Sequence, residues 1–199
     1  MRVRKAGQED RAAVARLLFE SAVDMYERFS GGQERALATL ERAFDTPGNL
    51  ASQDVTWLAE FNGQPAAAMA AFPVAEAAER SRAYMDLTLR GTPFWRWPGV
   101  MRLYWTGGRA SPTPRENSFY IDALATDAAF RRRGAAQALL EEAERQARER
   151  GLRAVSLDTT MNNNGARALY AQAGYDEVAY RAPSRGLPGF VALIKPVGS

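Results

Sequence analysis

Cysteine and histidine are both absent from this chain of 199 residues. The lack of cysteine excludes disulfide bonds, thiolate metal sites and a cysteine nucleophile. The lack of histidine removes the usual general base, the usual metal ligand and any serine–histidine nucleophile system. Proton transfer would therefore have to use carboxylates, tyrosine, an amine or water. We expect no metal site.

Lysine is also scarce, because it occurs only at positions 5 and 195, and arginine supplies the remaining positive charge. The net charge of +3 is modest, and no strand combines basic with aromatic residues as RNA-binding sheets do. No apolar run is long enough to span a membrane, and the first ten residues lack the apolar core of a signal peptide. We therefore expect no nucleic-acid or membrane partner and a cytoplasmic location.

The length and the ordinary hydrophobic and charged fractions favour a single globular domain over residues 1–199. Hydrophobic periodicity and turn signals predict its elements. Asn62-Gly63 is a strong hairpin signal between two of the strands. We expect strands at 2–5, 55–61, 64–72, 118–126, 153–158, 175–182 and 189–195, and helices at 8–25, 33–44, 133–150 and 164–173.

Residues 73–117 form a long segment before the fourth strand, and it holds three of the four tryptophans. Its first part, 74–89, has a pattern that favours a helix, and its end, 107–114, is rich in glycine and proline and predicts a flexible loop. Two interpretations stay open for the aromatic side chains. They either form a lid or wall for a substrate with an apolar body, or cover a sheet face or a homodimer contact.

The most informative stretch follows the strand 118–126, where the chain reads Arg131-Arg132-Arg133-Gly134-Ala135-Ala136 and enters an amphipathic helix. The first backbone N–H groups of a helix have no partner within the helix, and the helix dipole adds positive charge at the same place. Glycine and alanine allow close approach to the backbone, and arginine supplies forked donors. This pattern is typical of a phosphate-binding loop.

Two motifs in this half of the chain resemble those of the GCN5-related N-acetyltransferases, the GNAT family. Arg131-x-x-Gly134-x-Ala136 fits the family's pyrophosphate-loop signature, with alanine where glycine is more common. Asn163-x-x-Ala166-x-x-Leu169-Tyr170, followed by Gly174-Tyr175, fits its later signature. The resemblance implies an α/β fold of the mixed α+β kind, in which helices flank a mixed, mostly antiparallel central sheet. The segment 73–117 is then an insertion, since the family usually has a short turn there.

The resemblance also implies a binding site for acetyl-CoA as the acyl donor. The backbone of the strand would pair with the pantetheine arm, and Asn163 would touch the same arm, although Asn163 is equally well placed as a helix N-cap. The residues expected at the donor site are Leu124, Ala125, Thr126, Arg131, Arg132, Arg133, Gly134, Ala135, Ala136, Gln137 and Asn163.

Two residues are candidates for the chemistry. Tyr170 matches the family's tyrosine that protonates the departing thiolate, and its alternative role is a core aromatic. Asp122 lies inside an apolar strand, where a carboxylate is costly unless it is functional or paired with an arginine. Strand alternation predicts Tyr120, Asp122, Leu124 and Thr126 on one face, and burial would raise the pKa of Asp122 to suit a general base. Asp24 and Glu27 remain alternative bases.

These observations predict an acetyl-CoA-dependent N-acetyltransferase in which a primary amine attacks the thioester directly in a ternary complex. The aromatic insertion favours a small-molecule acceptor. A peptide N-terminus or lysine is the alternative acceptor, and a non-catalytic acyl-CoA-binding module is the alternative function. The motifs are expected to contact the pyrophosphate and the pantetheine of the donor, and not its acyl group. The sequence therefore does not exclude a donor with a longer acyl chain.

Overall fold

The computed structural model describes residues 1–107, 116–183 and 188–198. The strands are β1 (Arg2–Lys5), β2 (Thr56–Phe61), β3 (Gln64–Pro73), β4 (Ser118–Thr126), β5 (Ala154–Thr160), β6 (Asp176–Arg181) and β7 (Phe190–Pro196). The helices are α1 (Arg11–Ser21), α2 (Val23–Ser30), α3 (Gln33–Asp45), α4 (Ala77–Arg90), α5 (Trp97–Gly107), α6 (Ala135–Glu149) and α7 (Asn164–Gln172). Residues 108–115, most of the expected flexible loop, lie outside the described residues.

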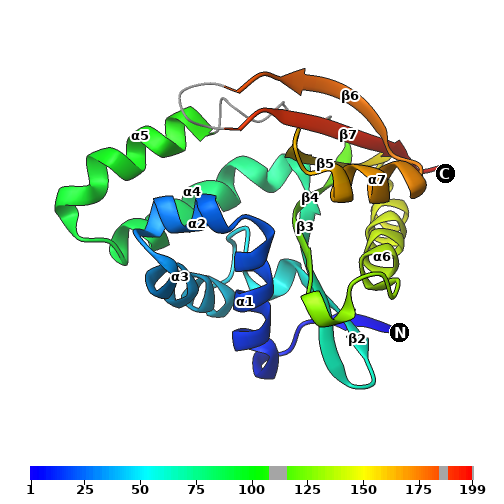
Figure 1. Ribbon diagram of the computed structural model, residues 1–199, viewed down its shortest axis with the longest axis horizontal. Helices are drawn as coiled ribbons and strands as arrows, with labels where there is room; N and C mark the ends of the chain where they lie inside the picture. Colours follow the sequence, from blue (N-terminus) through cyan, green and yellow to red (C-terminus); the bar gives the residue numbers. More distant parts are fainter. Residues whose placement is uncertain (108–115, 184–187, 199) are drawn as a thin grey trace.

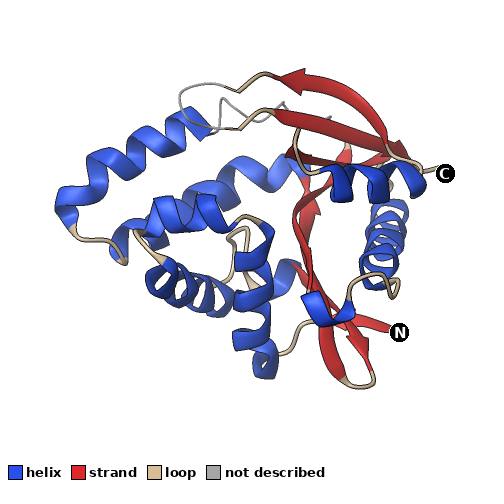
Figure 2. Ribbon diagram, in the orientation of Figure 1, coloured by secondary structure: helices blue, strands red, loops and turns tan. Residues whose placement is uncertain are grey.

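The strands form one seven-stranded sheet in the order β1-β2-β3-β4-β5-β7-β6. Only β4 and β5 run parallel, and every other neighbouring pair is antiparallel. Helices α1 to α4 lie on one side of the sheet, and α6 and α7 lie on the other (Figures 1 and 2). The expected mixed, mostly antiparallel sheet flanked by helices is confirmed.

The alanine-rich strand β3 passes between two hydrophobic cores. Ala67 and Ala71 belong to the core beneath α6, whereas Ala68 and Ala70 belong to the core beneath α1 and α3. All four are at most 1% exposed. A strand that is buried on both faces needs small side chains where helices approach it closely, which explains the weak β-propensity of this segment.

The first helix is broken, which differs from the single helix expected over 8–25. Ala22 has φ −155° and ψ 55°, and it separates α1 from α2. The helix α2 then ends at Gly31, whose φ of 83° is left-handed and favours glycine. The hydrophobic period continues across Ala22, so the pattern alone does not reveal the break. The corner between α1 and α2 faces a cavity described below.

A β-bulge interrupts the alternation of β4. Ile121 lies opposite Ala71 and Ala123 lies opposite Ala70, so Asp122 is an extra residue without a partner in β3. Ala123 packs in the α1 and α3 core, and Leu124 packs against the α6 core. The predicted common face for Asp122 and Leu124 is therefore wrong. Asp122 stays with Tyr120 on the face away from α6, since both line the cavity on that side, and the bulge instead turns Leu124 toward α6.

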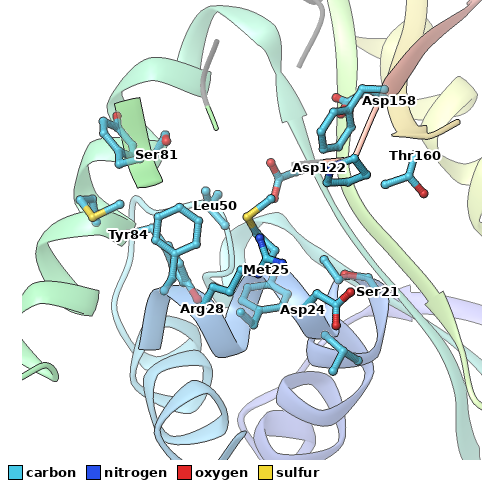
Figure 3. A pocket seen from close by; sticks show the side chains of 18 of the residues that line it. Ser21, Asp24, Met25, Arg28, Leu50, Ser81, Tyr84, Asp122, Asp158 and Thr160 are labelled. Atoms are coloured by element: carbon cyan, nitrogen blue, oxygen red, sulfur yellow. The ribbon is translucent and has the colours of Figure 1, made fainter. Parts of the chain in front are cut away.

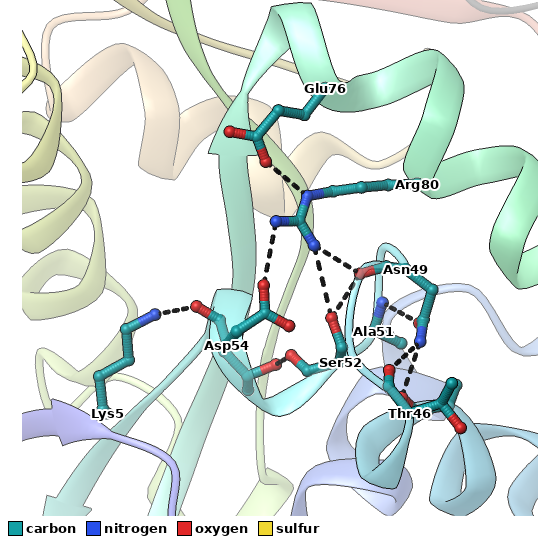
Figure 4. A network of polar contacts seen from close by, with 10 residues as sticks. Lys5, Thr46, Asn49, Ala51, Ser52, Asp54, Glu76 and Arg80 are labelled. Carbon is teal, nitrogen blue, oxygen red and sulfur yellow. Dashed lines mark hydrogen bonds and ion pairs between the residues drawn. The ribbon is translucent and has the colours of Figure 1, made fainter.

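The insertion contains two helices, of which only α4 was expected. Its anchor is Arg80, which lies 2.7 Å from Glu76 and 3.0 Å from Asp54 and donates to the backbone oxygen of Asn49 at 3.1 Å (Figure 4). This network joins α4 to the loop before β2. The second helix, α5, was missed because its aromatic and proline residues have low helix propensity.

Candidate active site

The arginine-rich loop leads into the N-terminus of α6 through two left-handed residues, Arg132 (φ 60°) and Gly134 (φ 82°). Space around Gly134 is open, since a Cβ built on it would meet no atom within 4 Å. Ala135, the first residue of α6, is 2% exposed and packs into the core. The loop therefore holds the helix N-terminus against the sheet while leaving its free N–H groups accessible. These features fit the expected pyrophosphate of acetyl-CoA.

The three arginines of this loop differ in their surroundings. The guanidinium of Arg133 lies over the rings of Phe61 and Phe130, at 5.2 Å and 5.8 Å from their centroids. The side chain of Arg131 reaches back to the backbone oxygen of Thr126 at 3.5 Å. Within the described part of the chain, no ion pair engages these arginines. Their charge is therefore available to an anionic ligand, and Arg133 is the one held in place by aromatic contacts.

Strands β4 and β5 separate at the centre of the sheet. Their parallel pairing begins at Ser118 with Ala154 and ends at Ile121 with Leu157, although both strands continue. From Ala123 onward β4 pairs only with β3, so its other edge offers free backbone groups. An open strand edge can pair with an extended ligand. This edge carries Leu124, Ala125 and Thr126, the residues expected to contact the pantetheine arm.

Two carboxylates lie on neighbouring strands at the point where β4 and β5 separate. Asp122 follows the last paired residue of β4, and Asp158 follows the last paired residue of β5. Burial, together with the nearby charge of Asp158, raises the pKa of Asp122 to about 7. The hydroxyl of Tyr120 donates a hydrogen bond to Asp158. Among the described residues Asp122 has no ion pair with an arginine, so the structural alternative raised by the sequence is not observed.

Tyr170 extends from α7 into the core beneath α6, and its side chain is 7% exposed. Burial and the charge of Asp158 raise its pKa above the ordinary value for tyrosine. Both expected roles are thus compatible, since the ring is a core residue while its hydroxyl lies within electrostatic reach of the site. Asn163 is the N-cap of α7, because its side-chain oxygen accepts a hydrogen bond from the N–H of Ala166 at 3.2 Å.

A cavity of about 640 Å³ lies on the side of the sheet opposite α6. The carboxylates of Asp122 and Asp158 belong to its wall on the sheet side (Figure 3). The corner between α1 and α2 forms a second wall, and the insertion forms a third through Ser81, Tyr84 and Tyr104. Its volume is in the range of small-molecule sites.

The sequence interpretation missed Asp158. A signal was present, because Asp158 is the one charged residue of β5 and follows four consecutive buried residues. Of the two alternative bases, Asp24 lines the cavity but is exposed, whereas Glu27 is not among the described residues that line it. Asp122 is therefore the carboxylate that combines burial, a raised pKa and access to the cavity.

A family model described as the acetyltransferase (GNAT) family matches residues 16–175. The chain is thus an acetyltransferase-class protein by sequence and fold. It belongs to the GNAT family. A crystal structure of an N-acetyltransferase from Staphylococcus aureus Mu50 has a TM-score of 0.76 and 20% identity, covering 98% of this chain and 100% of that one.

Two further structures show the same fold. One, known only as an acetyltransferase, has a TM-score of 0.70 and 22% identity over 100% of both chains. The ribosomal-protein-S18-alanine N-acetyltransferase from Escherichia coli has a TM-score of 0.56 and 15% identity, over 100% of this chain and 94% of that one. At these identities the likeness concerns the fold alone. No curated protein matches the sequence.

Two features are absent from the residues that the structure describes. None of the helices there has the length and apolar character needed to cross a membrane. Across residues 1–107, 116–183 and 188–198, no three acidic side chains are grouped in a way that would hold a metal ion.

Proposed function

We propose that this protein is an acetyl-CoA-dependent N-acetyltransferase that transfers the acetyl group to the primary amine of a small molecule. The observation that carries the proposal is the separation of β4 and β5. On one side of it lie the open strand edge and the phosphate loop, and on the other lies a buried carboxylate that faces a ligand-sized cavity. A donor and an acceptor can therefore meet at one point from opposite sides.

The donor side is supported by three kinds of group. The N-terminus of α6 and the arginines of residues 131–133 suit the pyrophosphate. The edge of β4 suits the amides of the pantetheine arm. Bound acetyl-CoA supplies the acetyl group as a thioester, so the protein itself needs no nucleophile. Direct attack by the acceptor in a ternary complex is consistent with a chain that has no cysteine.

Asp122 is proposed as the general base. A primary amine is mostly protonated near neutral pH and must lose a proton before it can attack. A carboxylate with a pKa of about 7 accepts protons far better at neutral pH than an ordinary aspartate does. Asp122 lines the cavity, where an acceptor amine would reach it directly or through one water molecule.

Tyr170 is proposed as the general acid. The bond from the amine nitrogen to the acetyl carbon forms, the carbon–sulfur bond breaks, and the sulfur leaves with the electron pair. Tyr170 protonates that sulfur and regains its proton from water. The acceptor ammonium loses one proton to Asp122 before attack and a second to water afterwards, so charge and atoms balance.

The insertion favours a small-molecule acceptor over a peptide. Its helices contribute Ser81, Tyr84 and Tyr104 to the cavity, opposite the carboxylates. A peptide or protein substrate needs an open groove in which its chain can continue past the reacting amine. The insertion instead adds a wall over this approach.

Isothermal titration of the purified protein with acetyl-CoA is the direct test of the donor site, with 3′-dephospho-CoA and pantetheine as controls. We expect micromolar binding that is lost when the pyrophosphate is absent. Acetylation of a panel of small amines, a peptide with a free N-terminus and a lysine peptide then tests the acceptor class. Donor binding without turnover of any amine would favour the non-catalytic module, and faster turnover of a peptide would overturn the small-molecule acceptor.

A further inference from the structure

Tyr84 of the insertion carries a buried hydroxyl group that has no hydrogen-bond partner among the described residues. The residue is 9% exposed and lines the cavity. A buried hydroxyl without a partner is costly, typically by about 1–3 kcal/mol. Such a group calls for an explanation, and a water molecule, an ion or a ligand atom can supply the missing hydrogen bond. Because Tyr84, unlike Tyr175, lines the cavity, a polar ligand atom bound there could be the partner of its hydroxyl.

The position of this hydroxyl indicates which ligand atom it meets. Tyr84 and Asp122 line the same cavity, and the negative charge of Asp122 contributes to the raised pKa of Tyr84, after burial and Tyr26. Asp158 adds a second carboxylate at the same end. A hydroxyl oxygen and two carboxylates are all acceptors for an N–H donor. A ligand atom between them would be a nitrogen that carries several protons.

The charges around the cavity are mainly negative. Its described lining includes four carboxylates and a single cationic side chain, Arg28. Arg16 lies 3.0 Å from one of the carboxylates, Glu20, and another, Asp24, is exposed at the α1–α2 corner. Asp122 and Asp158 are therefore the carboxylates that face the interior. Such surroundings favour a cation and disfavour an acid group beside the reacting amine.

Aromatic rings form much of the rest of the wall. Tyr26 and Tyr84 meet edge to face with centroids 6.4 Å apart, and Phe29, Tyr104 and Phe190 also line the cavity. Ring faces attract both apolar groups and ammonium ions. A short polar amine would leave most of the cavity of about 640 Å³ unfilled.

We propose that the acceptor is an alkylammonium ion with an apolar, ring-sized body and no acid group beside the amine, and that Tyr84 together with Asp158 positions its ammonium against Asp122. This inference rests on the proposed N-acetyltransferase function and adds the substrate class. The insertion then contributes a specificity-determining residue, and the acceptor ammonium donates the hydrogen bond that Tyr84 lacks.

The test uses four acceptors with the full chain and acetyl-CoA: 2-phenylethylamine, ethylamine, phenylalanine and phenylalaninamide. Ethylamine lacks the apolar body, and phenylalaninamide matches the size of phenylalanine without its carboxylate. We expect kcat/KM to be highest for 2-phenylethylamine. We expect phenylalanine to be slower than phenylalaninamide by about 100-fold, because its carboxylate would be desolvated beside Asp122 and Asp158.

Tyr84→Phe removes only the unpartnered hydroxyl. We expect KM for 2-phenylethylamine to rise by roughly 10-fold with kcat and acetyl-CoA affinity nearly unchanged, since a hydrogen bond to a charged group is lost. Tyr175→Phe is the matched control, because Tyr175 also has a buried hydroxyl without a partner but does not line the cavity. This control should leave KM for the amine unchanged.

Each result bears on one proposal. Turnover of phenylalanine as fast as phenylalaninamide, or an unchanged KM in Tyr84→Phe, would overturn this inference while leaving the acetyltransferase intact. Acetyl-CoA binding with turnover of none of the four amines would also overturn it. Failure of acetyl-CoA to bind a folded protein would instead overturn the proposed function itself.

Discussion

The two sides of the candidate site are built in different ways. The donor side is made of consecutive residues: β4, the arginine loop and the start of α6 occupy residues 118–137, and α7 follows after one strand. The acceptor side gathers the α1–α2 corner, α4, α5 and residues of β4, β5 and β7 that lie far apart in the chain. Backbone groups dominate the first side, and side chains dominate the second.

This difference matches what each side has to recognise. Phosphates and amides can be bound by N–H groups that any residue supplies, so a short pattern of glycine, alanine and arginine is enough. An acceptor is recognised by the shape and charge of a cavity, and many combinations of side chains can build one. Four substitutions, ordered from the largest expected effect to the smallest, test whether the two sides act separately.

Gly134→Glu should abolish binding of acetyl-CoA, with a loss of roughly 100-fold or more, because it puts negative charge where phosphates would sit. Gly151→Glu is the matched control. Gly151 also has a left-handed φ, 66° against 82°, and open space around it, but it lies beyond the C-terminal end of α6. Titration calorimetry compares the two, and thermal melting checks folding. If both folded variants bound acetyl-CoA equally well, the loop of residues 131–136 would not be its phosphate-binding site.

Asp122→Asn should lower kcat/KM by about 100-fold or more without weakening acetyl-CoA binding. The base works in its deprotonated form, so the wild-type rate should rise with pH through about 7 and fall below it. The variant should lose this inflection. A pH profile of kcat/KM measures both, with the exposed Asp176→Asn as control. A wild-type profile that is flat between pH 6 and 8 would contradict Asp122 as the base.

Tyr170→Phe should lower kcat by about 10- to 100-fold, since protonation of the leaving sulfur would depend on water. Acetyl-CoA affinity should stay within about twofold, because the ring and its packing remain. Tyr175→Phe serves again as the control, since its ring packs 6.0 Å from that of Tyr170 in the same core. Single-turnover kinetics separate this step from product release. An unaltered rate would exclude Tyr170 from the mechanism.

Arg80→Met should weaken acceptor binding without changing the affinity for acetyl-CoA. The guanidinium of Arg80 joins α4 to Asp54 and to the loop before β2, and its partners are partly exposed (Figure 4). We expect a loss of stability of about 1 kcal/mol, a melting temperature lower by about 2–4 °C, and a few-fold higher KM for the amine. Arg82→Met, at an exposed position of the same helix, should change neither. A weaker acetyl-CoA affinity in Arg80→Met would show that the two sides are coupled.

Most of the fold followed from local patterns. The hairpin at Asn62-Gly63 forms with both residues left-handed, and the helix of residues 33–45 and all seven strands lie close to where periodicity predicted them. The two errors in the N-terminal half have a common cause. Both depend on packing against other elements: the break at Ala22 has no breaker residue to mark it, and α5 forms although it contains Pro98, Gly99 and aromatic residues of low helix propensity.

The sequence by itself predicted the proposed donor side, because the features of a phosphate loop lie in adjacent residues, and Tyr170 follows them in a recognisable motif. Tertiary structure alone decided the acceptor side. The sheet sets Asp122 and Asp158 on neighbouring strands where β4 and β5 separate, and the insertion brings Tyr84 to the wall of the same cavity. These residues come together only when the sheet and its helices pack, since burial and proximity are properties of the folded chain.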